Sequence, residues 1–356
     1  IRNIATDRAA ALPGVLKVLT AADWKAAGLG ELVCVHPMPF SDGRPMNEAL
    51  RPLFATARVR HVGDVVSCVI AETRDQARDA ADAVEVDYDP LPAVTEIARS
   101  LDADAPVLHE EFGTNLVFEI ERGDKAATDA AFAKAHHVTE MTLPSQRLAG
   151  SPMETRSCLS RYDAATGQYT IWATSQTPHY MRSWLAKYLL FEPEHRIRVI
   201  SPDVGGGFGL KVHVCEFATI AWASKLLLRA VKWTATRSET FTADAQARDH
   251  HCVARMAFDD AGKILAIEAD TIAGLGAYLS QFAPSIPGNS YPQTITGLYT
   301  TPAAWLRVRA AYTNTVPVDA YRGSGRPEAP WVNERLLENG AREMGLDVVE
   351  IRKTNL

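Results

Sequence analysis

The stretch Val204–Lys211, with the sequence VGGGFGLK, places four glycines within five consecutive positions. The preceding residues, Arg196–Ile200, have the composition of a strand, and the following residues, Glu216–Arg229, repeat apolar side chains at helical spacing. Glycines in such a loop let backbone N–H groups approach a ligand closely, and the following helix N-terminus adds partial positive charge. The stretch therefore predicts a site for an anionic or oxo group, and a tight turn that binds nothing is the alternative.

Two common nucleotide-binding motifs do not fit this stretch. A Walker loop needs a glycine directly before its lysine, and here Leu210 precedes Lys211. The last glycine of the dinucleotide fingerprint G-x-G-x-x-G would also fall on Leu210. A flavin or nicotinamide Rossmann protein is therefore a weak alternative.

Two further segments carry side chains that suit a cofactor. Ala173–Pro178 ends a predicted strand, Tyr169–Ala173, and the amide of Gln176 can donate to an oxo group or ligand. Ala320–Glu328 is a glycine-bearing loop before a predicted helix, Trp331–Met344, and its two arginines suit a phosphate or an anionic cofactor. Taken singly, the first is often a polar strand end and the second an ordinary helix-entry loop.

Composition places the chain among globular proteins of two or three domains. It has 356 residues, of which 47% are hydrophobic and 22% charged. The net charge of −6, from 37 basic and 43 acidic residues, leaves no excess to neutralise a phosphate backbone, so nucleic acid is not an expected partner. The apolar runs are too short for a membrane span, and no secretory or transit peptide is recognisable, so we expect a cytoplasmic location.

The chain offers no evident ligand set for a metal. Its five cysteines are far apart and form no C-x-x-C pair, so neither a disulfide framework nor an iron–sulfur or zinc site is expected from this chain alone. The pair His213 and Cys215 falls short of the three or four ligands that a metal site needs.

Local patterns divide the chain into three parts. In the first hundred residues, Val65–Ile70 predicts a buried strand, Thr73 and Gln76 form a capping-box pattern that starts a helix, and Val84–Tyr88 alternates as a second strand. The spacing of apolar residues then becomes irregular between Arg99 and Asp124, and from His136 onward it indicates a mixture of strands and helices. We therefore predict an α+β chain with a first domain over 1–100, a linker over 101–130 and a second domain over 131–356.

In this order along the chain, the three loop segments resemble the molybdenum-binding large subunit of the xanthine dehydrogenase, aldehyde oxidase and aerobic carbon monoxide dehydrogenase family. The segments ALPGV at Ala11–Val15, RHVGD at Arg60–Asp64 and VDYDPL at Val86–Leu91 resemble its α/β-hammerhead domain. The remainder resembles its first molybdopterin-binding domain, closing on EIRKTNL at Glu350–Leu356.

The resemblance implies a cofactor and the residues that serve it. Molybdenum would be held by the dithiolene of a molybdopterin, in the cytosine dinucleotide form of bacterial members, so no side-chain metal ligand is implied. Gln176 would donate to an oxo ligand, and Arg322 would contact the cofactor site, which makes both candidate catalytic residues. The backbone of four loop residues would line the cofactor: Gly206, Gly207, Phe208 and Gly209.

The resemblance also implies an activity and partners. The reaction is hydroxylation of a small molecule with water as the oxygen source, and electrons pass to 2Fe-2S and FAD groups on partner subunits or domains. The family's general-base glutamate, in a Gly-x-Gly-Glu segment, is absent from this chain, and GLGE at Gly28–Glu31 lies in the wrong region. We therefore expect a chain that begins inside the hammerhead and needs a C-terminal molybdopterin-binding half, either as its missing continuation or as a separate subunit. The alternative is a non-catalytic scaffold or degenerate paralogue.

Three positions bear on the substrate. Carbon monoxide dehydrogenases carry a copper-binding Cys after the loop arginine, where this chain has Gly323. Xanthine oxidisers carry a glutamate and a phenylalanine where this chain has Val212 and Ser324. Oxidation of carbon monoxide and of purines is therefore disfavoured, and an aldehyde or an N-heteroaromatic compound fits better.

Overall fold

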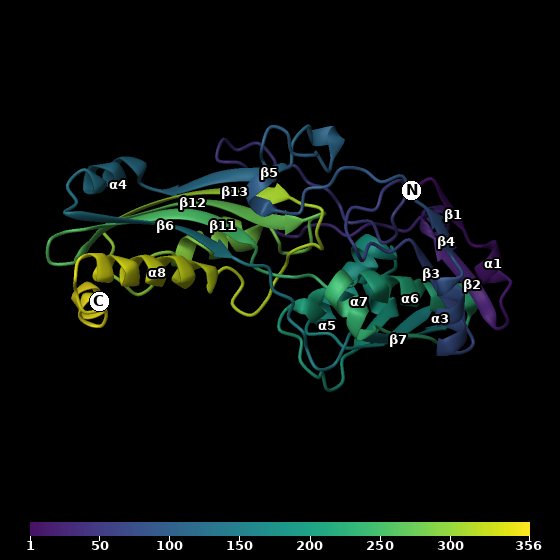
Figure 1. Cartoon of the computed structure of the whole chain (residues 1–356). Helices are drawn as coiled ribbons and strands as arrows, with labels where there is room; N and C mark the ends of the chain where they lie inside the picture. Colours follow the sequence, from purple (N-terminus) through teal and green to yellow (C-terminus); the bar gives the residue numbers. More distant parts are fainter. The chain divides into compact units, whose positions relative to one another are not determined.

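The computed structural model describes residues 1–356 and groups them into two units, each drawn from three separate stretches of chain. Unit 1 comprises Ile1–Val33, Leu50–Pro92 and Gly150–Ala245, and unit 2 comprises Cys34–Ala49, Ala93–Ala149 and Gln246–Leu356. Figure 1 traces the path of the chain through both. No helix has both the length and the apolar character that a membrane span requires.

The N-terminal part of unit 1 holds two small antiparallel sheets and three short helices. The strands are β1 (Asn3–Ala5), β2 (Val15–Thr20), β3 (Ser67–Ala71) and β4 (Glu85–Asp87), and the helices are α1 (Asp7–Ala10), α2 (Ala21–Ala26) and α3 (Arg74–Asp82). The predicted capping box is confirmed, because Thr73 Oγ1 accepts from the Gln76 N–H and Gln76 Oε1 accepts from the Thr73 N–H. β3 pairs with β2 and β4 with β1, so the predicted strand–helix–strand unit is shared between two sheets.

The rest of unit 1 is a four-stranded sheet in the order β10-β7-β8-β9. Its elements are β7 (Ser157–Asp163), β8 (Gln168–Ala173), α5 (Pro178–Trp184), the π-helical turn η3 (Leu185–Leu189), η4 (Glu194–Arg196), β9 (Ile197–Ile200), η5 (Leu210–Val212), α6 (Cys215–Leu227), β10 (Val231–Thr234) and α7 (Arg237–Ala243). β8 and β9 are parallel, with α5 in the crossover between them, so the chain leaves both strands at the same edge of the sheet. Ligands of sheets with parallel strands commonly bind beyond such an edge.

Unit 2 is built on a five-stranded sheet in the order β5-β13-β12-β11-β6. Its strands are β5 (Leu116–Gly123), β6 (His137–Ser145), β11 (His250–Phe258), β12 (Ile264–Gly276) and β13 (Ala303–Tyr312). Its helices are α4 (Lys125–Phe132), α8 (Glu328–Glu343), α9 (Glu350–Asn355) and the single turns η1 (Ile97–Arg99), η2 (Glu110–Phe112), η6 (Ile286–Ser290) and η7 (Pro292–Thr294). Figure 1 shows α8 running along one face of this sheet, where it packs on β6 and β11.

The structure differs from the predicted linker over 101–130. β5 lies inside that range as an edge strand of the unit 2 sheet, and α4 begins there. Val117, Phe118 and Ile120 of β5 are fully buried. The charged residue Glu119 lies between them and accepts a 2.8 Å hydrogen bond from Arg307 of β13. The ion pair between Glu119 of β5 and Arg307 of β13 explains why a strand that is otherwise buried resembles a polar linker in the sequence.

Candidate functional site

The glycine loop follows β9 and leads through η5 into α6, as the sequence predicts. Gly206 and Gly209 have φ values of +92° and +111°, and Phe208 between them has +55°. A Cβ on Gly207 would lie 2.4 Å from Gln176 Oε1. The loop therefore needs its glycines for two reasons: left-handed backbone at some positions and close approach to Gln176 at another.

The Gln176 side chain is fixed at its carbonyl end and unpaired at its amino end. Oε1 accepts hydrogen bonds from the Gly209 N–H at 2.8 Å and from the Lys211 N–H at 3.4 Å. Because both loop groups are donors, they determine which way the amide is turned. The Gln176 backbone N–H donates to the Lys211 carbonyl at 3.1 Å. The side chain is exposed, and its Nε2 group has no acceptor in the chain, so two N–H donors remain available to a ligand.

Backbone donors in the same loop are also unpaired. The N–H groups of Gly207 and Phe208 have no hydrogen-bond acceptor in the chain, although Gly207 is buried. Buried backbone N–H groups are nearly always paired in folded proteins. Together with Gln176 Nε2, they form a set of donors without a competing acceptor. Such a set fits an oxo, phosphate or other anionic group, and it fits the cofactor that the sequence resemblance implies.

An ion pair between a buried lysine and a partly exposed glutamate contacts the loop. The Lys211 side chain is completely buried, and its Nζ donates to Glu154 Oε2 at 2.6 Å. The same oxygen accepts from the Gly205 N–H at 2.8 Å. Burial alone would raise the pKa of Glu154, but the hydrogen bonds from Lys211 and Gly205 outweigh burial and hold that pKa below its usual value. Glu154 was not singled out in the sequence, because only the fold brings it beside the loop.

The Arg322 loop lies in unit 2, between β13 and α8. Gly323 and Gly325 have φ values of +98° and +90°. Buried Arg248 donates through Nη2 to the Arg322 carbonyl at 2.9 Å and through Nη1 to Glu328 at 3.1 and 3.2 Å. The Arg322 side chain is exposed and has no partner in the chain, so its charge faces outward from a loop that Arg248 holds.

The structure thus brings together part of the predicted site. Gln176, Gly206, Gly207, Phe208 and Gly209 are neighbours in unit 1, whereas Arg322 belongs to unit 2. Arg248 is buried and supports the Arg322 loop from within unit 2. No group of three or more His, Cys, Asp or Glu side chains is placed to hold a metal ion.

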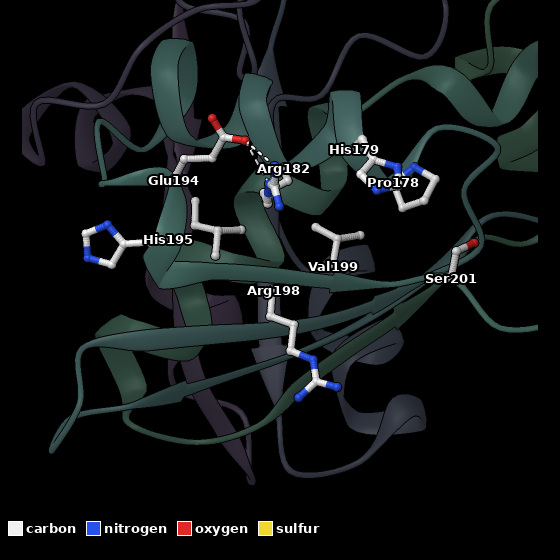
Figure 2. A pocket seen from close by; sticks show the side chains of 9 residues that line it. Pro178, His179, Arg182, Glu194, His195, Arg198, Val199 and Ser201 are labelled. Atoms are coloured by element: carbon white, nitrogen blue, oxygen red, sulfur yellow. Dashed lines mark hydrogen bonds and ion pairs between the residues drawn. The ribbon is translucent and has the colours of Figure 1, made fainter.

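A surface pocket of about 310 Å³ lies beside this site in unit 1, between α5 and β9 (Figure 2). The Arg182–Glu194 ion pair, at 2.6 Å, lies in its wall, with His179 nearby. Ser201 lies at the end of the pocket, and its hydroxyl donates to the Ser175 carbonyl at 2.6 Å. The pocket therefore borders the segment that carries Gln176, although the sequence did not point to it.

Comparison with known proteins agrees with this geometry. A model of the molybdopterin cofactor-binding domain matches residues 108–356, and a model of the aldehyde oxidase and xanthine dehydrogenase a/b hammerhead domain matches residues 1–92. These matches define a molybdopterin-binding protein with the predicted α+β fold. The chain belongs to the xanthine dehydrogenase family, and it matches the hammerhead and molybdopterin cofactor-binding domains of that family.

The relatives cover this chain completely but are much longer. The carbon monoxide dehydrogenase large chain of Afipia carboxidovorans is 36% identical over 100% of this chain and 44% of its own length. The nicotine 6-hydroxylase large subunit of Paenarthrobacter nicotinovorans is 33% identical, over 100% and 43%. The crystal structure of quinoline 2-oxidoreductase from Pseudomonas putida superposes with a TM-score of 0.91 at 33% identity, over 100% and 44%. The chain therefore spans less than half the length of these relatives.

Proposed function

We propose that this chain supplies part of the molybdenum site of a hydroxylase that oxidises an aldehyde or an N-heteroaromatic compound with water as the oxygen source. The observation that carries the proposal is the anchored Gln176 amide, whose carbonyl is bound by the Gly209 N–H while its N–H groups stay free. A bound molybdenum pterin would supply the two-electron oxidation of the substrate carbon. The chain itself supplies donors in fixed positions.

The candidate residues have distinct tasks in this proposal. Gln176 Nε2 and the N–H groups of Gly207 and Phe208 donate hydrogen bonds to the cofactor. Gly206 and Gly209 give the loop its left-handed turns. Because the donors are already oriented by the fold, little reorganisation is needed when negative charge develops at the site. We propose Arg322 as a further cofactor contact, on the strength of the sequence resemblance and its exposed, unpaired guanidinium.

The substrate class follows from three positions and from the relatives. Gly323 has no side chain that could bind copper, Val212 is apolar and buried, and Ser324 offers no aromatic surface. Relatives named for nicotine and quinoline cover the whole chain, which supports a nitrogen heterocycle as the substrate. The carbon monoxide dehydrogenase relative has similar identity, but the glycine at 323 argues against that reaction here.

We further propose the partners and the form of the cofactor. The pterin is the cytosine dinucleotide, and 2Fe-2S and FAD groups on partner subunits receive the electrons in the cytoplasm. The chain spans less than half the length of its relatives, so we propose that a C-terminal molybdopterin-binding half completes the site. We propose the hammerhead over 1–100, and we extend the first molybdopterin-binding domain, predicted over 131–356, to include β5, which pairs with β13.

Metal analysis tests the proposal that the chain alone holds an incomplete site. The 356-residue chain should carry little molybdenum when it is produced alone, and a stoichiometric amount when it is produced with the C-terminal half. Pterin released from the same samples should follow the metal. A stoichiometric molybdenum content in the isolated chain would show that no further half is needed.

A further inference from the structure

The ion pair between buried Lys211 and partly exposed Glu154 has no task in the function proposed above. Lys211 is the one lysine of the chain whose side chain is fully buried, and Glu154 is the only hydrogen-bond partner of its Nζ atom. Burying an ammonium group is unfavourable, and well-packed apolar residues usually give a fold at least as much stability as a buried ion pair does. A charged pair at this position therefore calls for an explanation other than stability.

The contacts of the pair supply that explanation. Glu154 Oε2 receives two donors at once, the ammonium of Lys211 at 2.6 Å and the Gly205 N–H at 2.8 Å. The Glu154 N–H in turn donates to the Gly205 carbonyl at 3.1 Å. The carboxylate thereby joins the start of the glycine loop to the residue that ends it.

Lys211 also fixes the Gln176 side of the site through its backbone. Its N–H donates to Gln176 Oε1 at 3.4 Å, its carbonyl accepts from the Gln176 N–H at 3.1 Å, and the Ser175 hydroxyl donates to the same carbonyl at 3.4 Å. A single residue of the loop therefore contacts two segments that are far from it in the sequence, at Glu154 and at Ser175–Gln176.

We propose that Lys211 and Glu154 form a positioning pair, which holds the glycine loop against the Gln176 carbonyl and so directs the Gln176 amide toward the cofactor. The inference rests on the proposed function for the identity of the cofactor, but the positioning itself concerns only this chain. Neither residue of the pair needs to touch the cofactor or the substrate.

Lys211→Met is the informative variant, because methionine fills a similar apolar space without the charge. The Glu154 side chain is 36% exposed, so it can turn to water once its cation is gone, and it then releases the Gly205 N–H. The buried slot stays filled and no unpaired charge is left inside. We therefore expect the melting temperature to change little while the loop loosens.

The experiment measures hydrogen exchange of the loop peptides in the complete assembly, together with turnover. In Lys211→Met the amides of residues 204–211 should exchange on the order of ten times faster than in the wild type. Turnover per bound molybdenum should fall about 10- to 100-fold, the range seen when the support of a metal-site group is lost, with KM nearly unchanged. Lys225→Met is the matched control, because it breaks the 2.6 Å Lys225–Glu192 ion pair of the same unit away from the loop, and it should change neither quantity.

Unchanged exchange of the loop in a folded Lys211→Met assembly would overturn the proposal. If that variant does not fold, Glu154→Gln replaces it, since a carboxamide keeps the acceptor for the Gly205 N–H and removes only the charge. It should accelerate loop exchange by a smaller factor, and wild-type exchange would again overturn the proposal. Faster exchange in an assembly whose wild type contains no molybdenum would support the positioning pair and refute the proposed function, so the two failures are distinguishable.

Discussion

Gln176 is the residue on which the proposed site depends most. Its Oε1 is bound by two backbone N–H groups, so its amino group is presented outward in one orientation. Gln176→Ala should reduce turnover per bound molybdenum by about 10²- to 10³-fold, the usual loss when one preoriented donor is removed from a catalytic site. Molybdenum content and the melting temperature should stay close to wild type, because the side chain is exposed.

The matched control for this variant is Gln168→Ala, because Gln168 is also exposed and begins β8, the strand that leads to the Gln176 segment. Turnover should be assayed against a panel of aldehydes and nitrogen heterocycles and normalised to bound molybdenum. If Gln176→Ala keeps turnover within a factor of about two of Gln168→Ala, Gln176 is not the donor that we assign.

Arg322 makes a different prediction because it contributes a charge. Its side chain is exposed and unpaired in the chain, so Arg322→Ala opens no core cavity and should change the melting temperature little, in contrast to the loss of about 2–5 kcal/mol from a large-to-small core substitution. Turnover should fall, and the molybdenum content should fall with it if the guanidinium contacts the cofactor. Wild-type molybdenum content and turnover in a folded Arg322→Ala assembly would remove this residue from the site.

At the scale of elements, α6 is tied to the unit 1 sheet by buried charges. Arg156, just before β7, donates to Glu216 in the first turn of α6 through both Nη atoms and to Asp244 through Nε at 2.6 Å. Burial alone would raise the pKa of Glu216, but the charge of Arg156 outweighs it and lowers that pKa to about 2. Burial raises the pKa of Asp244, so of the two carboxyl groups Glu216 is the more acidic.

The ion pair between Arg156 and Glu216 predicts that the fold loses stability in acid. The folded-state pKa of Glu216 lies below the value of 4.5 expected without the structure, so the unfolded chain binds the proton first as pH falls. Ionised Glu216 therefore adds about 3 kcal/mol to the free energy of unfolding at any pH above its unfolded-state pKa. This contribution is lost as pH falls from the unfolded-state pKa toward the folded-state pKa. Urea unfolding from about pH 6 to about pH 3 should show this loss, and Glu216→Gln should flatten the curve. If the free energy of unfolding of the variant fell equally steeply with pH, another group would be responsible for the acid sensitivity.

Elements with a local signal could be predicted from the sequence, and those without one could not. The strand before the glycine loop, the helix after it and the capping box at Thr73 depend on neighbouring residues, and the structure confirms all three. β5 escaped prediction because Glu119 interrupts its apolar residues, and only its partner Arg307 on β13 makes that charge compatible with a strand. α8 begins at Glu328, earlier than predicted, where Arg248 neutralises the carboxylate.

At the scale of the molecule, the sequence indicates the family but not the arrangement of the chain. The chain passes from one unit to the other at residues 33–34, 49–50, 92–93, 149–150 and 245–246, which the predicted boundaries at 100 and 131 do not match. The candidate site was likewise only partly predictable from the sequence. Gln176 and the glycines were predictable from motifs, whereas Glu154 and Arg248 act through contacts with residues far away in the sequence.

We propose above all that the donors around the glycine loop bind a molybdenum pterin. The most direct test is elemental and pterin analysis of the complete assembly isolated from its source, with turnover measured on the same sample. The account predicts a stoichiometric molybdenum content with a pterin dinucleotide, together with iron and flavin on the subunits that co-purify. An assembly that hydroxylates its substrate at full rate without molybdenum would contradict it.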